Sequence, residues 1–492
     1  MSRSAHPAGP LHADVLPEAA HAAAPAELGV LDPLIWPASA ERVDGVLHIG
    51  GLSVQEIARR HGTPTVVLDE DDVRARARSF VDAFAGADVF YAGKAFLCTG
   101  MARWIDEAGL GLDVCSGGEL AVALAAGFPA ERIALHGNNK SVGELRRAVG
   151  AGVGRIVVDS LAEIGRLAAI AAGAGIRQRV LVRVTVGVEA HTHEFIATAH
   201  EDQKFGLSAA GGQAGEAVAV ILGHESLELV GLHSHIGSQI FFTDGFEIAA
   251  HRVVGLMVRI RDRHGVELPE IDLGGGFGIA YVTGDDPAPV KDIATRLQQI
   301  VERECAAADL AMPRISVEPG RAIVGPGGVS VYEVGTVKPV ELDGRAIRTY
   351  VSLDGGMSDN IRTALYDAQY TVVLASRSST AEPMLTRVVG KHCESGDVLV
   401  RDAWLPADVV PGDLLAIAAT GAYCRSMASN YNFVPRPPVV AVLDGQDTVL
   451  VRRETEDDLM ALDTGCGGRS LEEPMSRIAP RVNERAKSKD SQ

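Results

Sequence analysis

Short apolar runs alternate with longer amphipathic stretches between residues 88 and 317. Between most of the apolar runs, Ala, Leu, Glu and Arg recur with helical spacing, as in 118–126, 161–172, 245–263 and 291–308. Strand–helix alternation over this length predicts a parallel sheet with both faces covered. The runs that we interpret as strands are Asp88–Ala92, Gly111–Val114, Arg132–His136, Arg155–Val158, Arg179–Val186, Leu227–His233, Glu270–Leu273 and Arg314–Val317.

Eight such units predict an α/β fold, a closed (β/α)8 barrel of the TIM type over residues 65–320. A closed barrel is favoured because it leaves no exposed sheet edge. An open, doubly wound sheet is the alternative, but it does not by itself explain eight consecutive units.

The pattern changes near residue 331, where helical spacing fades and short alternating runs dominate. These runs predict a second, antiparallel β domain formed by residues 31–64 and 321–475. We expect the early run Arg42–Ile49 to join it, because that strand needs a partner outside the barrel. The other predicted strands are 331–340, 348–353, 370–374, 385–389, 414–418, 439–443 and 448–453.

Both chain ends differ in amino-acid composition from the two predicted domains. Residues 1–30 are rich in Ala, Pro and His and lack a basic segment followed by an apolar core, so we predict a disordered leader and not a secretion signal. Residues 476–492 are polar and predict a flexible tail.

The charge balance argues against some classes of binding partner. The 492 residues carry 46 Lys and Arg against 64 Asp and Glu, a formal net charge of −18, and no basic stripe is present. This composition argues against nucleic-acid or anionic-membrane partners, and no apolar run approaches a membrane span. The six cysteines, at 98, 115, 305, 393, 424 and 466, show no close pairing, which favours a reducing cytoplasm over disulfides or a zinc site.

Reactive and glycine-rich residues follow the predicted strands. Barrel chemistry gathers at the C-terminal ends of the strands, so Lys94, after the first strand, is a candidate Schiff-base lysine. The run Gly274, Gly275 and Gly276 after strand seven lets backbone N–H groups approach a phosphate, and Arg321 and Ser238 can add a charge and a donor. Singly, each motif also fits an ordinary turn or surface residue. Together they favour a phosphorylated ligand beside an imine-forming lysine, and pyridoxal 5′-phosphate (PLP) satisfies both.

The chain resembles the diaminopimelate decarboxylases of the fold-type III PLP-dependent family, whose fold is alanine racemase-like. The resemblance covers about residues 35 to 470. One departure is Phe96, where many members have Asn, and we expect only a local packing difference there. The motifs that carry the resemblance are Tyr91-Ala92-x-Lys94-Ala95, Asp113-Val114-x-Ser116-Gly117-Gly118-Glu119-Leu120, His233-Ser234-His235-Ile236-Gly237-Ser238, Gly274-Gly275-Gly276, Glu318-Pro319-Gly320-Arg321, Cys393-Glu394-Ser395-Gly396-Asp397 and Gly421-Ala422-Tyr423.

The resemblance implies a set of cofactor contacts. Lys94 would hold PLP covalently, and Glu318 would face the ring nitrogen, where the racemase relatives have an arginine; a carboxylate there favours decarboxylation. His235 would stack on the ring, although alternation along the strand alone does not decide between His233 and His235. The remaining implied cofactor residues are Asp113, Ser238, Gly274, Gly275, Gly276, Pro319, Gly320, Arg321 and Tyr423.

The resemblance also implies the substrate, meso-2,6-diaminopimelate, which is converted to L-lysine and CO₂ in the last step of lysine biosynthesis. A distal amino-acid head needs a cation for its carboxylate and an anion for its ammonium, and Arg362 and Glu394 supply that pair. Arg321, Tyr366 and Tyr423 complete the implied substrate site.

Cys393 is the candidate acid that returns a proton to the substrate carbon; the alternative is a buried, unreactive cysteine. In the family this cysteine loop enters the active site of a second subunit, which implies a homodimer with shared sites.

Two other interpretations remain open. The histidines in His191-Thr192-His193-Glu194 and His200-Glu201 resemble metal ligands, but their spacing matches no helical metal motif, so we predict a polar mobile loop and no metal. The alternative functions are another fold-type III decarboxylase, acting on ornithine, arginine or carboxynorspermidine, and a regulatory homologue without cofactor.

Overall fold

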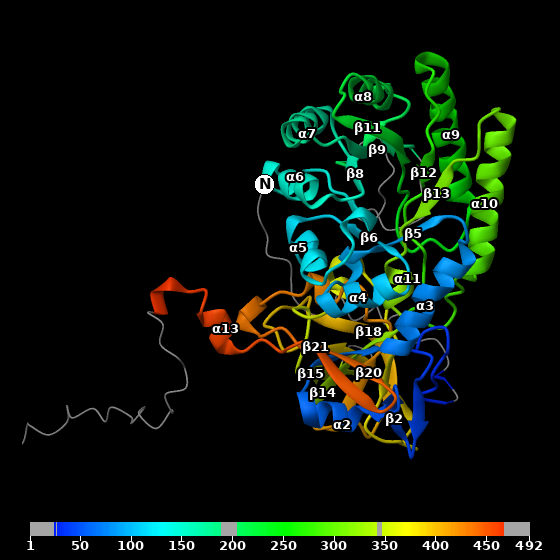
Figure 1. The fold of residues 1–492 in the computed structure, drawn as a ribbon. Coiled ribbons are helices and arrows are strands. Elements are labelled where there is room, and N and C mark those ends of the chain that lie inside the picture. The colour runs from blue at the N-terminus through cyan, green and yellow to red at the C-terminus, as the bar shows by residue number, and fades with distance from the viewer. Residues whose placement is uncertain (1–23, 26, 188–203, 342–346, 467–492) are drawn as a thin grey trace, which may run out of the picture.

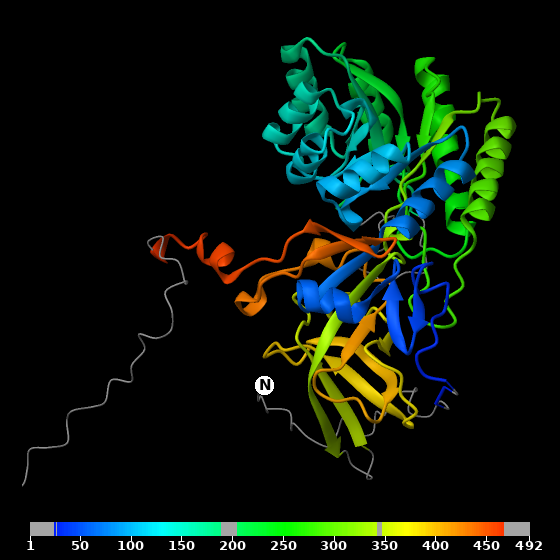
Figure 2. The ribbon, with the colours of Figure 1, turned by 60° about the horizontal axis from the view of Figure 1, so that its bottom comes forward.

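The computed structural model describes residues 24–25, 27–187, 204–341 and 347–466. The predicted tail, most of the predicted leader and the histidine-containing loop at 191–201 lie outside these residues. Figures 1 and 2 show two stacked parts, a barrel surrounded by helices and a β domain below it. No helix in the described ranges combines the length and apolar character needed to cross a bilayer.

The upper part is a closed barrel of eight parallel strands, which confirms the predicted fold class. Strands pair in the order β9-β11-β12-β13-β5-β6-β7-β8, and β8 pairs with β9 to close the ring. Their predicted positions agree within two residues at each end. The barrel strands are β5 (Asp88–Ala92), β6 (Gly111–Val114), β7 (Ile133–Leu135), β8 (Arg155–Val158), β9 (Gln178–Thr185), β11 (Leu227–His233), β12 (Glu270–Asp272) and β13 (Arg314–Val317).

Helices cover the outside of the barrel (Figure 1). Several begin where a serine at the N-cap accepts a backbone N–H, which satisfies a donor that the first turn leaves free. Ser141 and Glu144 form a full capping box at the start of one of them. The helices are α3 (Glu70–Ala83), α4 (Thr99–Glu107), α5 (Gly117–Ala125), α6 (Val142–Ala151), α7 (Leu161–Ala174), α8 (Gln213–Leu222), α9 (Asp244–His264) and α10 (Val290–Ala307).

The lower part is a mainly antiparallel sheet with its own apolar core. Its order is β18-β17-β15-β14-β4-β20-β21, with β19 pairing to β14 and β16, and two pairs, β15–β17 and β4–β20, are parallel. The sequence pattern missed β18, whose alternation is interrupted by Arg401 and Asp402. The strands are β4 (Thr65–Asp69), β14 (Gly328–Glu341), β15 (Ile347–Leu353), β16 (Val372–Leu374), β17 (Pro383–Val389), β18 (Val398–Pro406), β19 (Leu414–Ile417), β20 (Val439–Leu443) and β21 (Gln446–Val451).

The N-terminal strands differ from the prediction. β4 was placed at the start of the barrel, but it pairs with β14 and β20 in the lower sheet. The run near residue 45 forms a separate three-stranded sheet of β1 (Glu41–Val43), β2 (Val46–Ile49) and β3 (Leu52–Ser53). Leu47 and Ile49 pack into the core of the β domain, so the run joins that domain by packing and not by extending its sheet.

The barrel is therefore an insertion in the β domain. The chain leaves the lower sheet after Asp69 and returns at Gly328, which lies opposite Leu68 in the β4–β14 pair. The Asp69 N–H donates to the Gly327 carbonyl over 2.8 Å, which joins the two connections.

Candidate active site

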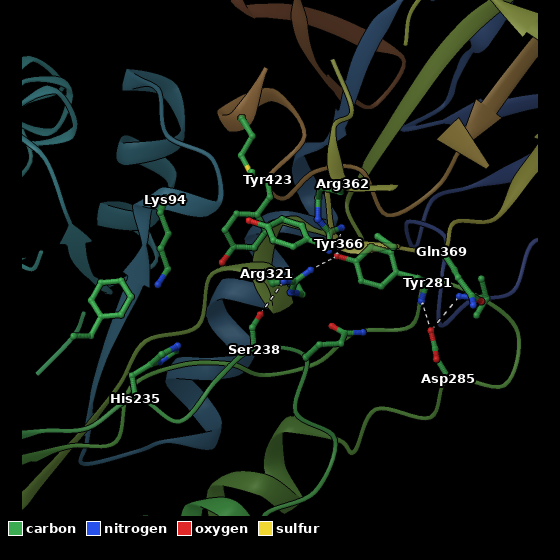
Figure 3. A pocket seen from close by; sticks show the side chains of 15 residues that line it. Lys94, His235, Ser238, Tyr281, Asp285, Arg321, Arg362, Tyr366, Gln369 and Tyr423 are labelled. Atoms are coloured by element: carbon green, nitrogen blue, oxygen red, sulfur yellow. Dashed lines mark hydrogen bonds between the residues drawn. The ribbon is translucent and has the colours of Figure 1, made fainter. Parts of the chain in front are cut away.

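A cavity of about 500 Å³ lies between the C-terminal ends of the barrel strands and the β domain. Figure 3 shows Lys94 and His235 at one end and Asp285 and Gln369 at the other, with Arg321 between them. A smaller adjoining cavity of about 50 Å³ shares Lys94, His235, Ser238, Arg321 and Tyr423 and is also lined by Gly276, Glu318 and Gly320. Both domains therefore contribute to one site.

Lys94 lies in a single 3-10 turn, Gly93–Ala95, directly after β5. The Ala95 carbonyl accepts the Tyr423 N–H over 2.8 Å and the Ser426 hydroxyl over 2.7 Å, so the β domain fixes this turn. The Lys94 side chain is deep in the protein but exposed to the cavity. Burial lowers the pKa of its ammonium, but Tyr423, Asp113 and Glu318 outweigh burial and raise the pKa above its usual value.

The three positions after β12, Gly274 to Gly276, leave no room for a side chain. A Cβ on Gly275 would lie 2.2 Å from the Glu318 carbonyl, and one on Gly276 would lie 2.4 Å from the Gly237 carbonyl. Gly274 and Gly276 also have φ values of 71° and 103°, which disfavour side chains. The loops after β11, β12 and β13 can therefore approach one another closely beside the smaller cavity.

The structure gives the two candidate histidines, His233 and His235, different surroundings. His235 lines both cavities with Lys94. His233, at the end of β11, is buried, and its Nε2 lies 3.4 Å from the Glu318 carboxylate. His235 therefore has the placement required of the ring-stacking residue.

Five buried titratable groups form a layer in the barrel, which we call the acid–histidine cluster. It consists of Asp113, His136, His233, Asp272 and Glu318. His136 Nε2 lies 2.9 Å from Glu318 Oε1 and 3.7 Å from Asp113 Oδ1. Ligand atoms of His136, His233 and Glu318 all lie within 4.8 Å of one another, a spacing that could also hold a metal ion.

Burial and mutual charge set the protonation of this cluster. Burial raises the pKa of Asp113 to about 6 and that of Asp272 well above its usual value. Burial lowers the pKa of His233 to about 4. For His136, burial is outweighed by Asp113 and Glu318, and the pKa rises to about 9. For Glu318, burial is outweighed by His136 and His233, and the pKa falls well below its usual range.

Two arginines and two tyrosines form the second group in the site, the arginine–tyrosine cluster of Tyr281, Arg321, Arg362 and Tyr370. The Tyr281 hydroxyl accepts hydrogen bonds from both Arg321 and Arg362, the second over 2.9 Å (Figure 3). Arg321 also donates to Ser238 Oγ over 2.8 Å, and Arg362 to the Tyr370 hydroxyl over 2.5 Å. Among the described residues, neither arginine forms a salt bridge with a carboxylate.

Cys393 and Glu394 are exposed and do not line the cavity of their own chain. Their loop is nevertheless held firmly, because the Asp397 carboxylate accepts the N–H groups of His392 over 2.8 Å and Met357 over 2.6 Å. Within one chain, the structure does not bring these two residues to Lys94.

Most of the other predicted site residues do meet at the cavities. The substrate candidates Arg321, Arg362, Tyr366 and Tyr423 line the larger one. Neither cavity is lined by Asp113, Gly274, Gly275 or Pro319.

The sequence interpretation overlooked several residues that shape the site. Tyr281 follows the glycine run within a few residues, His136 ends a predicted strand, and Asp272 is the last residue but one of another. Their positions after or at strand ends were the available signal.

Comparison with known proteins identifies the family. Residues 70–325 match the family described as pyridoxal-dependent decarboxylase, pyridoxal binding domain. Diaminopimelate decarboxylase of Mycobacterium tuberculosis is 60% identical over 443 residues, covering 89% of this chain and 99% of the relative. The chain belongs to the diaminopimelate decarboxylase family.

Other members of the diaminopimelate decarboxylase family agree over most of their length. The Mycobacterium leprae relative is 58% identical over 470 residues, covering 93% of this chain and 99% of the relative. The crystal structure of diaminopimelate decarboxylase from M. jannaschii in complex with L-lysine aligns with a TM-score of 0.81 and 31% identity, over 87% of this chain and 98% of that one.

The residues around the smaller cavity fit PLP, as expected for this family. The Glu318 carboxylate is buried and lines this cavity, so it can accept a hydrogen bond from a protonated ring nitrogen. Arg321 Nε has no acceptor among the described residues, which suits an anionic group such as a phosphate.

Proposed function

We propose that this enzyme removes the carboxylate from the D-centre of meso-2,6-diaminopimelate, giving L-lysine and CO₂ in the last step of lysine biosynthesis. The observation that carries the proposal is a single cavity with Lys94 at one end and Arg362 further along it. Such a cavity suits a substrate with an amine to react and a distant carboxylate to bind. The names of the relatives compared above point to the same substrate.

The cofactor in this proposal is PLP, held covalently by Lys94. Glu318 would face the ring nitrogen, His235 the ring face, and Gly276, Ser238 and Arg321 the phosphate. When bound, PLP supplies an electron sink for the electron pair left behind as CO₂ departs.

The other residues position the substrate. Arg362 is buried and already oriented by Tyr281 and Tyr370, so it can bind the distal carboxylate at little further cost in side-chain entropy. Tyr366 and Tyr423 line the same cavity and enclose the substrate between the two domains. This enclosure reduces the access of water to the reacting carbon.

We further propose a homodimer, in the cytoplasm, in which Cys393 and Glu394 act in the partner's cavity. Cys393 would return a proton to the reacting carbon, and Glu394 would bind the distal ammonium. The exposure of both residues on a firmly held loop supports this arrangement, because a loop that serves its own cavity would face inward. The free state of all five cysteines whose side chains are described also suits a reducing compartment.

A substrate panel tests the reaction. CO₂ release should be fastest from meso-2,6-diaminopimelate and far slower from ornithine, arginine and lysine. Faster release from ornithine would contradict the proposed substrate, and no imine absorbance after addition of PLP would contradict the proposed cofactor.

Mixing two inactive variants tests the shared sites. In a two-fold dimer, Lys94→Ala and Cys393→Ala subunits should exchange so that half of the molecules contain one intact site. An equimolar mixture should therefore recover about one quarter of wild-type activity. Each variant mixed only with itself is the control, and no recovery despite subunit exchange would contradict the trans arrangement.

A further inference from the structure

The acid–histidine cluster lies behind the cavity and is not explained by contacts with substrate or cofactor. Only Glu318 of its five members lines the smaller cavity. His136 follows β7 and His233 ends β11, and both rings contact Glu318 from within the barrel. Glu318 therefore lines the cavity while its carboxylate contacts two imidazoles.

The two imidazoles are not equivalent. His136 Nε2 lies 2.9 Å from Glu318 Oε1, which is ion-pair distance when the imidazole is protonated. His233 Nε2 lies further away, at 3.4 Å from both Oε1 and Oε2 of Glu318. The two rings meet edge to face, with centroids 5.0 Å apart and planes at 70°.

The surrounding charges favour one buried ion pair. Asp113, Glu318 and Asp272 interact electrostatically with His136. The positive charges of Lys94 and Arg183 interact with Glu318 in the same way. Burial favours the neutral forms of Asp272 and His233, whereas His136 and Glu318 keep opposite charges up to a pH near the His136 pKa of about 9. At neutral pH, the cluster thus places an imidazolium directly behind the Glu318 carboxylate.

We propose that His136 is a positioning residue for Glu318: its imidazolium keeps that carboxylate ionised and turned toward the cofactor, so that the proton between Glu318 and the ring nitrogen stays on the nitrogen. The inference rests on the proposed function, because it requires PLP at this position. His233, being neutral, contributes orientation and little charge.

The physical reason is a competition for one proton. That proton can reside on the ring nitrogen, beside a carboxylate, or on Glu318, beside a neutral ring. A cation within about 4 to 6 Å of a carboxylate lowers its proton affinity, so the imidazolium disfavours the second state. Without this cation, Glu318 would compete better for the proton, and the ring would withdraw electrons less strongly.

The test compares His136→Asn with the matched variant His233→Asn in the holoenzyme. PLP labelled with ¹⁵N at the ring nitrogen reports the protonation of that nitrogen by NMR, independently of activity. In His136→Asn, the pH at which the nitrogen loses its proton should fall by about one unit or more, and the alkaline limb of kcat should fall with it. In His233→Asn the shift should be clearly smaller.

Three results would overturn the proposal. The first is an unchanged nitrogen titration in His136→Asn, and the second is an equal shift in both variants. The third is a stoichiometric divalent metal in the purified holoenzyme that is lost with His136. If His136→Asn does not fold, the imidazole signals of wild-type holoenzyme decide: an imidazole of His136 that is neutral at pH 7 would refute the proposal.

These outcomes differ from failure of the proposed function. A wild-type enzyme that does not decarboxylate diaminopimelate, yet shows the nitrogen shift in His136→Asn, would refute the substrate and retain the role of His136. A wild-type enzyme that decarboxylates diaminopimelate, with no shift in the variant, would do the reverse.

Discussion

The acid–histidine cluster and the arginine–tyrosine cluster both bury charge, but they balance it differently. In the first, the His136 cation faces carboxylates of the same chain, Glu318 at 2.9 Å and Asp113 at 3.7 Å. In the second, Arg321 and Arg362 are buried and donate to the hydroxyl groups of Ser238, Tyr281 and Tyr370. A hydroxyl satisfies a hydrogen bond but does not neutralise a positive charge.

This difference separates a group that tunes the site from a group that recognises a ligand. Burying an unpaired charge is costly, so the arginine–tyrosine cluster gains stability when an anion enters the cavity. The acid–histidine cluster already contains its counter-charges and gains little in that way. We therefore expect variants of the arginine–tyrosine cluster to change ligand binding, and variants of the acid–histidine cluster to change pH dependence.

The largest effect is expected for Lys94, whose amine lies where the two clusters face one cavity. Lys94→Ala should lower activity by about a thousandfold or more, because no other described lysine lines the cavity to bind the cofactor covalently. The variant should fold and lose borohydride-trappable PLP, measured by mass spectrometry of the reduced protein. The exposed Lys338→Ala is the control, and trapping retained at another lysine in the Lys94 variant would refute the assignment.

A smaller effect is expected in the arginine–tyrosine cluster. Arg362→Lys keeps the charge but loses the planar guanidinium, which can bind a carboxylate with two hydrogen bonds while donating to Tyr281 and Tyr370. Loss of a charged hydrogen bond costs about 1.5 to 3 kcal/mol, so KM should rise about 10- to 100-fold with a lesser change in kcat. Steady-state kinetics measure this, with the exposed Arg452→Lys as control. An unchanged KM would show that another group binds the distal carboxylate.

A smaller loss of ligand binding is expected when Tyr281, which accepts hydrogen bonds from both arginines, is changed. Tyr281→Phe removes the oxygen that accepts from both guanidinium groups, at a cost of about 0.5 to 1.5 kcal/mol for each lost hydrogen bond. L-lysine binding, measured by calorimetry, should weaken about 3- to 10-fold. Tyr350→Phe, which leaves the cavity unchanged, should bind like wild type. Equal weakening in both variants would mean that the loss is not specific to the arginine pair.

The last effect concerns stability and not ligand binding: the acid–histidine cluster should make the free energy of unfolding depend on pH. The pKa of His136 is raised to about 9 in the folded protein, against about 6.5 in an unfolded chain. Its contribution to stability is therefore complete below about pH 6.5 and is lost as the pH rises through 9. In the cofactor-free protein, the urea midpoint should fall between pH 7 and 10, and less so in His136→Asn. The same decline in both proteins would assign the loss to other groups.

The strand ends were predictable because their signals are local. The barrel strands follow from apolar runs, and Lys94 and the glycine run stand directly after two of them. His235 could not be separated from His233 by alternation, because residues two apart on a strand point to the same face. The structure separates them because β11 ends at His233.

Other features depend on distant pairing and could not be predicted. β4 looked like a barrel strand because a buried parallel strand has the same apolar character in either sheet. Tyr281 bridges two arginines that only the fold brings together. Cys393 and Glu394 were recognised by motif, but nothing local shows where their exposed loop acts.

The insertion of the barrel between β4 and β14 has a consequence for engineering. Because the two connections leave adjacent, paired strands, the chain passes between the β domain and the barrel at one place only. Barrels from related enzymes could then be exchanged at residues 69 and 328 without lengthening or crossing the chain. Such chimeras would place Tyr281 and Arg321 of one parent beside Arg362 and Tyr370 of the other, so the arginine–tyrosine cluster would have to match between the two parents.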